Sequence, residues 1–302
     1  MRVIITGGTG LIGRALTAAL VARGDEVIVL SRDPKQSTGV ALGARIEKWD
    51  GETSRGWGSL VDGTTAIVNL AGAGIASGRW TAERKRLIRE SRLNAARAVV
   101  QAVRDAGERP RVVVQASAVG YYGPLGDDEV AEKAAPGTDF LARVCVDWEA
   151  GTAPIEELGV RRAVIRTGVV LSTRGGALPR MLLPYRFFVG GPLASGRQGF
   201  SWIHLDDEVG AIVFLLDQEA ARGPYNLTAP TPLTNAQFGR VLGRVLGRPS
   251  LFPTPAIALR LLFGEMATAL VDGQQVAPKR LLEHGFTFRY ANAEKALQNL
   301  LR

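Results

Sequence analysis

The sequence has a single cysteine, Cys145, among its 302 residues. An internal disulfide is therefore excluded, which agrees with a reducing compartment, and we expect a cytoplasmic location. No apolar run reaches the length that spans a bilayer, so we expect no membrane partner. Because strand-forming residues follow Met1 at once, we also expect no signal peptide. We interpret Cys145 as a small core residue.

The sequence also lacks the signatures of metal and nucleic-acid sites. His204, Asp206 and Asp207 lie close together, but the two aspartates are typical of the N-cap and first turn of a helix, so we expect no metal. The formal charge of +8 comes mostly from arginine, and a basic run covers residues 79–111. Beyond Trp80 this run contains no aromatic residue, so we expect no nucleic-acid partner. The run fits a solvated helix face better than a surface for an anionic ligand.

The chain does have a glycine-rich turn near its start. Residues 3–6 form a β-branched run, Gly7, Gly10 and Gly13 follow at three-residue spacing, and good helix formers come next. Gly7 tolerates positive φ, Gly10 lets backbone N–H groups approach phosphates, and Gly13 lets the helix pack closely on the strand. The start of a helix also attracts anions. This order of elements predicts the pyrophosphate site of a dinucleotide.

The first half of the chain alternates strands and helices. The expected strands are Val3–Thr6, Glu26–Leu30, Arg45–Trp49, Thr65–Leu70, Arg111–Ala116 and Arg162–Thr167. The expected helices are Leu11–Ala22, Thr81–Ala106 and Asp139–Leu158. Apolar strands separated by helices indicate an α/β protein with a Rossmann-type, doubly wound parallel sheet that is covered on both faces.

The second half is rich in loop signals and becomes mainly helical after Thr228. We expect residues 1–170 to form the dinucleotide-binding domain, with the sheet completed from within residues 200–230. Residues 171–302 should form a smaller, mixed and mainly helical substrate lobe, with helices at 235–246 and 256–271 and a C-terminal helical domain over about 249–296. This lobe should close over the edge of the sheet where such folds bind ligands.

The end of the second strand indicates which dinucleotide is bound. An NAD site has an acidic residue there, whereas this strand ends in Ser31-Arg32. A hydroxyl and a guanidinium suit the 2′-phosphate of NADP, so we favour NADP over NAD. Asp33 precedes a proline and marks the start of a loop. Asp50, after the third strand, is either an adenine contact or a turn residue.

Several stretches resemble the extended short-chain dehydrogenases/reductases. They are Thr6–Gly13 (TGGTGLIG), Asn69–Gly72 (NLAG), Ser117–Gly123 (SAVGYYG) and Ser201–Asp207 (SWIHLDD). Four further stretches resemble the atypical "epimerase family protein" branch, whose bacterial members carry a C-terminal domain of unknown function. They are Asn69–Trp80 (NLAGAGIASGRW), Arg166–Leu171 (RTGVVL), Gly190–Gln198 (GGPLASGRQ) and Gly273–Arg280 (GQQVAPKR).

The resemblance implies positions for an NADP site. Ser31 and Arg32 would hold the adenosine phosphate, Arg92 would face the nicotinamide side, and Val169 would touch the nicotinamide. The residues implied around the pyrophosphate are Gly7, Thr9, Gly10, Leu11 and Ile12. The residues implied beside the adenosine ribose are Leu70, Ala71 and Gly72.

The same family normally carries a Tyr-x-x-x-Lys pair on the helix after the fifth strand, and this chain lacks it. The corresponding helix has no tyrosine and no lysine. Phe140 or Leu141 would take the tyrosine position, and Val144 or Cys145 the lysine position. Neither combination can perform the usual acid–base chemistry. The family's serine or threonine corresponds to Ser117 only if one residue is inserted, and otherwise to Ala118.

Other side chains are therefore candidates for the chemistry. Tyr121 or Tyr122 could donate a phenolic proton, or serve as packing or substrate-wall residues. His204 could act as an acid or base, although a hydrogen-bonded role in the lobe is more usual. Ser117 completes the catalytic candidates. The candidates for the substrate pocket are Trp80, Tyr121, Arg197 and Trp202, where core packing is the stronger reading of Trp202, and Arg92 or Arg197 could hold an anionic substrate.

These features predict an NADP-binding oxidoreductase or epimerase-like protein that acts on a small carbonyl or sugar-like substrate. Because the Tyr-x-x-x-Lys pair is absent, a non-catalytic NADP-dependent sensor or regulatory partner-binding protein is the alternative. A cell-division-inhibitor-like role would be one form of it. The expected partner is a small molecule, and a homodimer stays open as the assembly.

Overall fold

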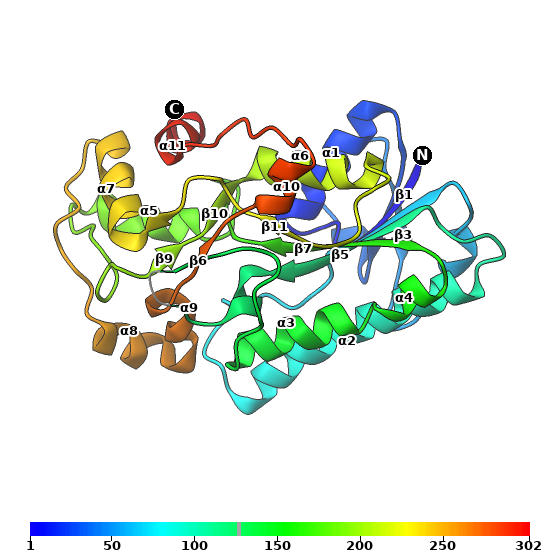
Figure 1. Cartoon of the computed structure of the whole chain (residues 1–302), viewed down its shortest axis with the longest axis horizontal. Helices are drawn as coiled ribbons and strands as arrows, with labels where there is room; N and C mark the ends of the chain where they lie inside the picture. The colour runs from blue at the N-terminus through cyan, green and yellow to red at the C-terminus, as the bar shows by residue number, and fades with distance from the viewer. Residues whose placement is uncertain (126–127) are drawn as a thin grey trace.

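A parallel sheet of seven strands forms the centre of the computed structural model, which describes residues 1–125 and 128–302 (Figure 1). From one edge to the other, the strands are β11 (Gly223–Leu227), β7 (Arg161–Thr167), β5 (Val112–Ala118), β4 (Thr65–Asn69), β1 (Arg2–Thr6), β2 (Glu26–Ser31) and β3 (Arg45–Lys48). The order reverses between β1 and β4, which pair in register from Arg2–Thr65 to Thr6–Asn69. Such a switch point opens a ligand crevice at the carboxyl ends of the strands.

Helices cover both faces of the sheet, as Figure 1 shows above and below it. On one face α1 (Leu11–Arg23) packs beside α6 (Leu205–Asp217), and apolar side chains such as Val3 and Ile5 of β1 are fully buried beneath them. The other face carries α2 (Ala82–Asp105), α3 (Phe140–Ala150) and α4 (Pro154–Glu157). Ile4, whose side chain points opposite to those of Val3 and Ile5 along β1, lies in the core beneath these helices. The chain therefore has the Rossmann-type, doubly wound α/β fold that the sequence predicts.

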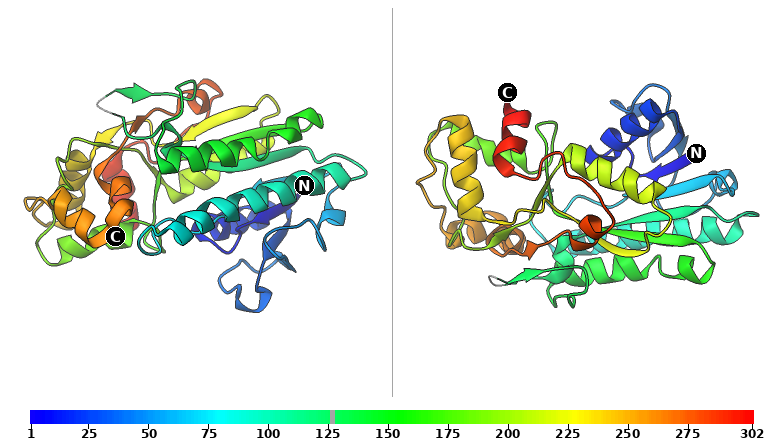
Figure 2. Two further views of the ribbon diagram at one scale, coloured as in Figure 1. Left: turned by 90° about the horizontal axis from the view of Figure 1, so that it is seen from below. Right: turned by 45° about the horizontal axis from the view of Figure 1, so that its top comes forward.

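The remaining elements form a lobe at one end of the sheet (Figure 2). Its core contains Trp202, Phe238 and Leu297. Its helices are α5 (Leu178–Arg186), α7 (Asn235–Leu246), α8 (Ala256–Phe263), α9 (Thr268–Val271) and α11 (Ala293–Leu301). Helix α10 (Lys279–Glu283) instead packs on β11, and its Leu281 lies in the core of the sheet domain. Short strand pairs connect it: β8 (Val169–Leu171) with β10 (Trp202–His204), β9 (Gly199–Phe200) with β12 (Leu233–Thr234), and β6 (Glu129–Val130) with β13 (Gln275–Val276).

Two helices that the sequence predicts as continuous are broken. The predicted helix 139–158 ends at Ala150, and α4 begins at Pro154, which has no N–H to continue a hydrogen-bond ladder. The predicted helix 256–271 divides into α8, the single turn η4 (Gly264–Ala267) and α9. Gly264 has φ +62°, a left-handed conformation that interrupts the helix there. None of the helices among residues 1–125 and 128–302 is both apolar enough and long enough to cross a bilayer.

The C-terminal segment returns to the sheet instead of ending as a separate appendage. The backbone of residues 274–277 is bound by buried side chains: Ser201 Oγ donates to the Gln274 carbonyl, and Thr228 Oγ1 donates to the Val276 carbonyl, both at 2.8 Å. A Cβ added at Gly273 would lie 2.1 Å from the Gly199 carbonyl oxygen, so only glycine allows this approach. The C-terminal segment is therefore held against β11, the edge strand of the sheet, and against the residues around Ser201.

Candidate cofactor and active site

The glycine-rich turn has the geometry that its spacing predicts. Gly7 has φ +69°, and its carbonyl accepts the N–H of Gly10 at 3.0 Å. A Cβ added at Gly13 would lie 2.4 Å from the Gly7 carbonyl oxygen and 2.5 Å from the Cα of Gly8. The start of α1 therefore packs directly on the turn, which brings its first turn to the carboxyl end of β1.

The N-terminus of α1 has unsatisfied donors. Gly10 is the N-cap and provides no side-chain hydrogen bond, and the first turn contains no acidic residue. The N–H groups of Leu11 and Ile12 follow directly, close to Thr9. Free N–H groups and the helix dipole at this position suit a pyrophosphate.

Ser31 and Arg32 lie at the end of β2, beside this turn. The hydroxyl of Ser31 is buried and accepts hydrogen bonds from Ser37 Oγ at 2.7 Å and from the Asp33 N–H at 3.2 Å. Arg32 is exposed, and its stem lies against Gly51. Among the described residues Arg32 forms no ion pair. The pair therefore offers one fixed hydroxyl and one uncommitted guanidinium, which is a fit for a 2′-phosphate.

Asp50 closes a local turn. Its carboxylate accepts the N–H groups of Glu52 and Thr53, both at 2.8 Å, and the Thr53 hydroxyl at 2.5 Å. Partial burial acts against ionisation, but these hydrogen bonds outweigh it and lower the pKa of Asp50. The turn interpretation describes this geometry, and the adenine contact stays a prediction.

A buried polar chain fixes the ends of β1, β4 and β5. Thr6 Oγ1 donates to Asn69 Oδ1 at 2.5 Å, and Asn69 Nδ2 donates to Gln115 Oε1 at 2.8 Å. All three side chains are fully buried. Thr6 Oγ1 also accepts the N–H of Ala71 at 3.2 Å. This chain sets the path of Leu70, Ala71 and Gly72, the segment implied to lie beside the adenosine ribose.

Arg92 supports that segment from α2. Its Nη1 donates to the carbonyls of Ala73 at 3.0 Å and Ile88 at 2.8 Å, and its guanidinium lies 4.8 Å from the ring centroid of Trp148. A Cβ added at Gly72 would contact Arg92 Cζ at 3.0 Å. Burial lowers the pKa of Arg92, which has no carboxylate partner among the described residues. Arg92 thus holds the loop after β4, and its predicted approach to the nicotinamide side stays untested.

The positions of the missing catalytic pair are filled by an apolar cluster. Phe140, Leu141 and Val144 of α3 pack with Trp80, whose ring centroid lies 5.3 Å from that of Phe140 in an edge-on arrangement. Trp80 is buried, and its Nε1 donates to the Ile75 carbonyl at 2.9 Å. The position of Trp80 corrects its prediction as an open pocket wall, because its ring belongs to this cluster. Cys145 is buried as expected, and burial raises the pKa of its thiol to about 11.

Tyr122 is enclosed in a buried network, which corrects its prediction as a proton donor. Its hydroxyl donates to Asn226 Oδ1 at 2.7 Å and accepts from Arg166 Nη1 at 3.1 Å. The side chain is 1% exposed. Burial raises the pKa of Tyr122, and the nearby charge of Arg166 opposes this only in part. A phenol with both hydrogen-bonding roles filled and no open face cannot serve a substrate.

Ser117 belongs to the same network. Its hydroxyl donates to Glu149 Oε1 at 2.6 Å, and Arg166 binds both oxygens of that carboxylate. Ser117 is 4% exposed, so its catalytic prediction is also corrected: the hydroxyl is committed to Glu149. The other carboxylate of the network, Glu132, accepts the N–H groups of Asn226 and Arg280 with one oxygen.

Sequence analysis missed the centre of this network. Arg166 stands on a buried strand, and Glu149 lies on α3 about one turn after the position of the missing lysine. The signal was available, because Arg166 directly follows the apolar run Ala163–Ile165 of a central strand, where a buried guanidinium needs acceptors for its hydrogen bonds. In the sequence analysis Arg166 appears only within the RTGVVL stretch.

Tyr121 differs from its neighbour. Its side chain is half-buried, and its ring centroid lies 3.4 Å from the guanidinium carbon of Arg166. Its hydroxyl forms no hydrogen bond to the described residues. Tyr121 is thus the phenol near the end of β5 whose hydroxyl is uncommitted.

His204 caps a helix, which corrects its prediction as an acid or base. Its Nδ1 accepts the Asp206 N–H at 3.0 Å at the start of α6, and its ring stacks on Tyr290 at 3.9 Å between centroids. Burial lowers the pKa of His204, although Asp206 and Asp207 favour the charged form. Trp202 is 1% exposed and lies in the lobe core, so it is not a substrate wall. In the described part of the chain no group of residues has the composition of a metal site.

Val169 begins β8, and Arg197 lies on the loop before β9. Val169 donates its N–H to the Ser201 carbonyl at 2.8 Å and pairs with Trp202, which fixes the turn after β7. Arg197 is exposed on the loop before β9. Their roles toward nicotinamide and substrate stay predictions.

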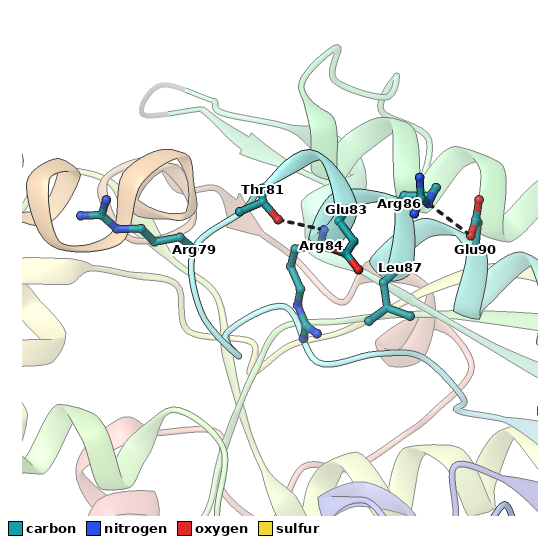
Figure 3. A pocket seen from close by; sticks show the side chains of 7 residues that line it. All are labelled: Arg79, Thr81, Glu83, Arg84, Arg86, Leu87 and Glu90. Carbon is teal, nitrogen blue, oxygen red and sulfur yellow. Dashed lines mark hydrogen bonds and ion pairs between the residues drawn. The ribbon is translucent and has the colours of Figure 1, made fainter.

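A surface hollow lies apart from these residues. Figure 3 shows it at the start of α2, where Arg79 points away from the other side chains toward α8. It is lined by Arg79, Thr81, Glu83, Arg84, Arg86, Leu87 and Glu90. Arg79 donates to the carbonyls of Leu261 and Leu262, so it fastens the end of α8. None of the predicted cofactor residues lines this hollow.

Comparison with known proteins agrees with this architecture. Residues 3–228 match the NAD dependent epimerase/dehydratase family, and residues 254–300 match a domain of unknown function, DUF1731. The chain is 41% identical to the epimerase family protein SDR39U1 homolog, chloroplastic, of Arabidopsis thaliana, covering 100% of this chain and 87% of that protein. It is also 41% identical to the epimerase family protein Mb2239 of Mycobacterium bovis, covering 98% and 96%.

A solved structure is similar over the whole chain. The crystal structure of human epimerase family protein SDR39U1 (isoform 2) with NADPH has a TM-score of 0.88 at 34% identity and covers 99% of both chains. Family match, full-length relatives and shared fold lead to one conclusion: this chain belongs to the NAD-dependent epimerase/dehydratase family, in its epimerase family protein branch with a C-terminal DUF1731 domain.

Proposed function

We propose that this chain binds NADP(H) across the carboxyl edge of its sheet. The observation that carries the proposal is the pairing of a fixed Ser31 hydroxyl with an exposed Arg32 beside the glycine-rich turn. An acid at this strand end would repel a 2′-phosphate, whereas a guanidinium binds it by charge-assisted hydrogen bonds. The NADPH in the human SDR39U1 crystal structure, which shares 34% of its residues with this chain, supports the assignment.

The proposed reaction is hydride exchange with a small carbonyl or sugar-like substrate. The nicotinamide supplies or accepts the hydride, and the chain must supply the proton and hold the substrate. Because Tyr122 and His204 are enclosed, Tyr121 is the phenol that we assign to proton transfer. The guanidinium of Arg166 lies 3.4 Å from the centroid of its ring, and this cation–π contact holds the ring in place. Arg197, exposed on the loop before β9, is assigned to an anionic group of the substrate.

A second candidate is an NADP(H)-dependent sensor without turnover. The observation that favours it is the apolar packing of Phe140, Leu141 and Val144 where the family's tyrosine and lysine would stand. A protein of this kind would retain the cofactor and report its redox state through a partner. Tyr121, the assigned proton donor, distinguishes the two candidates, because only the enzyme needs its hydroxyl for turnover.

The test measures NADPH binding first and turnover second. Nicotinamide fluorescence gives the affinity, and loss of nicotinamide absorbance follows oxidation over a panel of aldehydes, ketones and nucleotide sugars. The enzyme proposal expects oxidation that falls by about tenfold to a hundredfold in Tyr121→Phe without loss of NADPH affinity. Tight binding without oxidation over the whole panel supports the sensor. Failure to bind NADPH overturns both.

A further inference from the structure

At the lobe end of the molecule, which lies opposite β3 in Figure 1, large apolar side chains form an exposed surface. We name it the apolar patch. Its members are Leu183, Phe187, Phe188, Val189, Leu251, Phe252, Ile257, Leu261 and Leu262, each more than half exposed. At roughly 100 Å² for each side chain, the patch exceeds the few hundred Å² that monomeric proteins usually expose. An apolar area of this size indicates contact with another surface.

Hydrogen bonds hold the parts of the patch together. The N–H groups of Leu251 and Phe252 donate to the Gly190 carbonyl at 2.9 and 3.1 Å, which joins the loop before α8 to the loop after α5. α8 follows directly and buries only Leu259 of its eight residues. Three of its apolar side chains, Ile257, Leu261 and Leu262, are directed away from the protein core.

One residue of the patch adopts a costly backbone conformation. Phe188 has φ +61°, in the left-handed region, at the position that follows the C-cap of α5. Two backbone hydrogen bonds close this turn, from Phe188 N–H to the Tyr185 carbonyl and from Val189 N–H to the Pro184 carbonyl, each 3.0 Å. Glycine is the favoured residue at such a position, because it has no Cβ. Here the position instead presents an exposed aromatic ring.

The charged residues of the segments that supply the patch have one sign. Residues 172–205 and 220–264, which supply all its members, contain no aspartate and no glutamate but nine arginines. Arg244 pairs with Glu294, and Arg260 acts on Asp272. Arg186 and Arg248 pair with no carboxylate of the described residues, and the Arg248 guanidinium lies 4.1 Å from the ring centroid of Phe188. The stacked guanidinium of Arg248 and the exposed ring of Phe188 therefore lie at the same surface, so one ligand could contact both.

We propose that the apolar patch docks on an anionic lipid bilayer surface. Exposed phenylalanine and leucine side chains enter the boundary of the acyl chains, while Arg186 and Arg248 bind lipid phosphates. A twofold contact with a second copy is disfavoured, because it would bring unpaired arginines together without an acidic group to meet them. The proposal revises the sequence-based expectation of no membrane partner: that expectation concerned spanning segments, and this mode of binding needs none.

The test is sedimentation of the full chain with vesicles of phosphatidylcholine, with and without phosphatidylglycerol. We expect binding to the anionic vesicles and its loss at high salt. The Arg186→Gln and Arg248→Gln variants should each bind roughly fivefold more weakly, from about 1 kcal/mol for each charge near such a surface. Arg55→Gln and Leu42→Ser, at exposed positions of the sheet domain, are the matched controls and should bind as the wild type does.

Phe188→Gly separates docking from folding. Glycine fits the left-handed backbone there, so the thermal midpoint should stay level or rise while vesicle binding falls on the order of tenfold. The proposal is overturned if Phe188→Gly binds vesicles as the controls do, or if the wild type ignores phosphatidylglycerol. It is equally overturned if light scattering shows a dimer that Phe188→Gly converts to a monomer, because the patch then belongs to a second copy.

Discussion

Arg166 and Glu149 form a bidentate ion pair inside the protein, with Nε to Oε1 and Nη2 to Oε2 each at 2.9 Å. Although burial alone would lower it, the hydrogen bonds and charge of Glu149 raise the pKa of Arg166. Around this pair gather Ser117 and Tyr122, two of the four residues that the sequence suggested for catalysis. Their hydroxyl groups satisfy the ion pair, so they act in stability and not in chemistry.

Removal of the Tyr122 hydroxyl should therefore affect folding more than any activity. Tyr122→Phe leaves Asn226 Oδ1 and one N–H of Arg166 without a partner in a buried site. We expect a loss of about 1–3 kcal/mol in the free energy of unfolding, measured by urea denaturation. NADPH affinity at a temperature where the variant is folded should equal that of the wild type. A loss of turnover with unchanged stability would contradict this assignment.

Glu208 should make stability depend on pH. It is fully buried on α6, its Oε1 accepts the Thr167 hydroxyl at 2.8 Å, and burial raises its pKa to about 8. Between pH 4.5 and about pH 8 the folded protein keeps a proton on Glu208, whereas the unfolded chain has released it at its ordinary pKa of 4.5. The contribution of Glu208 to the free energy of unfolding is therefore complete below pH 4.5 and declines as the pH rises to about 8. Glu208→Gln keeps a neutral side chain there.

The comparison of the two proteins over pH tests this directly. The thermal midpoint of Glu208→Gln should match that of the wild type near pH 4.5 and exceed it increasingly up to about pH 8. Glu219→Gln, an exposed site at the end of the same region, serves as the control and should show no such widening. Parallel pH curves for Glu208→Gln and the wild type would show that Glu208 is ionised in the folded protein.

Gly13→Ala should damage the cofactor turn through sterics alone. A methyl group at Gly13 would lie 2.4 Å from the Gly7 carbonyl oxygen, so α1 must move away from the turn. We expect a loss of about 1–3 kcal/mol in stability and weaker NADPH binding. Gly107→Ala adds the same methyl where nothing lies within 4 Å and should change neither. Wild-type NADPH affinity in Gly13→Ala would show that the turn is not the pyrophosphate site.

The sequence predicted those parts of the molecule that depend on local patterns. Six of the seven sheet strands begin and end within two residues of their predicted positions, because apolar β-branched runs and glycine turns encode them locally. The seventh, β11, was expected only as a segment within residues 200–230. The role of Tyr122 was not predictable in this way. Its partners Arg166 and Asn226 are 44 and 104 residues away in the chain, so only the fold brings them together. For His204 the capping of α6 is local, but the stack on Tyr290 that helps to bury its ring depends on the fold. The exposure of α8 was equally hidden, since its apolar sequence reads as a core helix.

The location and assembly of the protein stay predictions. The sequence-based expectations were a cytoplasmic location and an assembly that includes a homodimer as an option. Size-exclusion chromatography with light scattering decides the second of these and also serves the vesicle experiment as its control.

The central claim is that Ser31 and Arg32 select NADP, and Arg32→Ala tests it most directly. Parallel titrations with NADPH and NADH, followed by nicotinamide fluorescence, compare this variant with the wild type and with Arg55→Ala. Loss of one charge-assisted phosphate contact, worth roughly 1.5–3 kcal/mol, should weaken NADPH binding by about tenfold or more and leave NADH binding nearly unchanged. Equal losses for both cofactors, or none for either, would contradict the account.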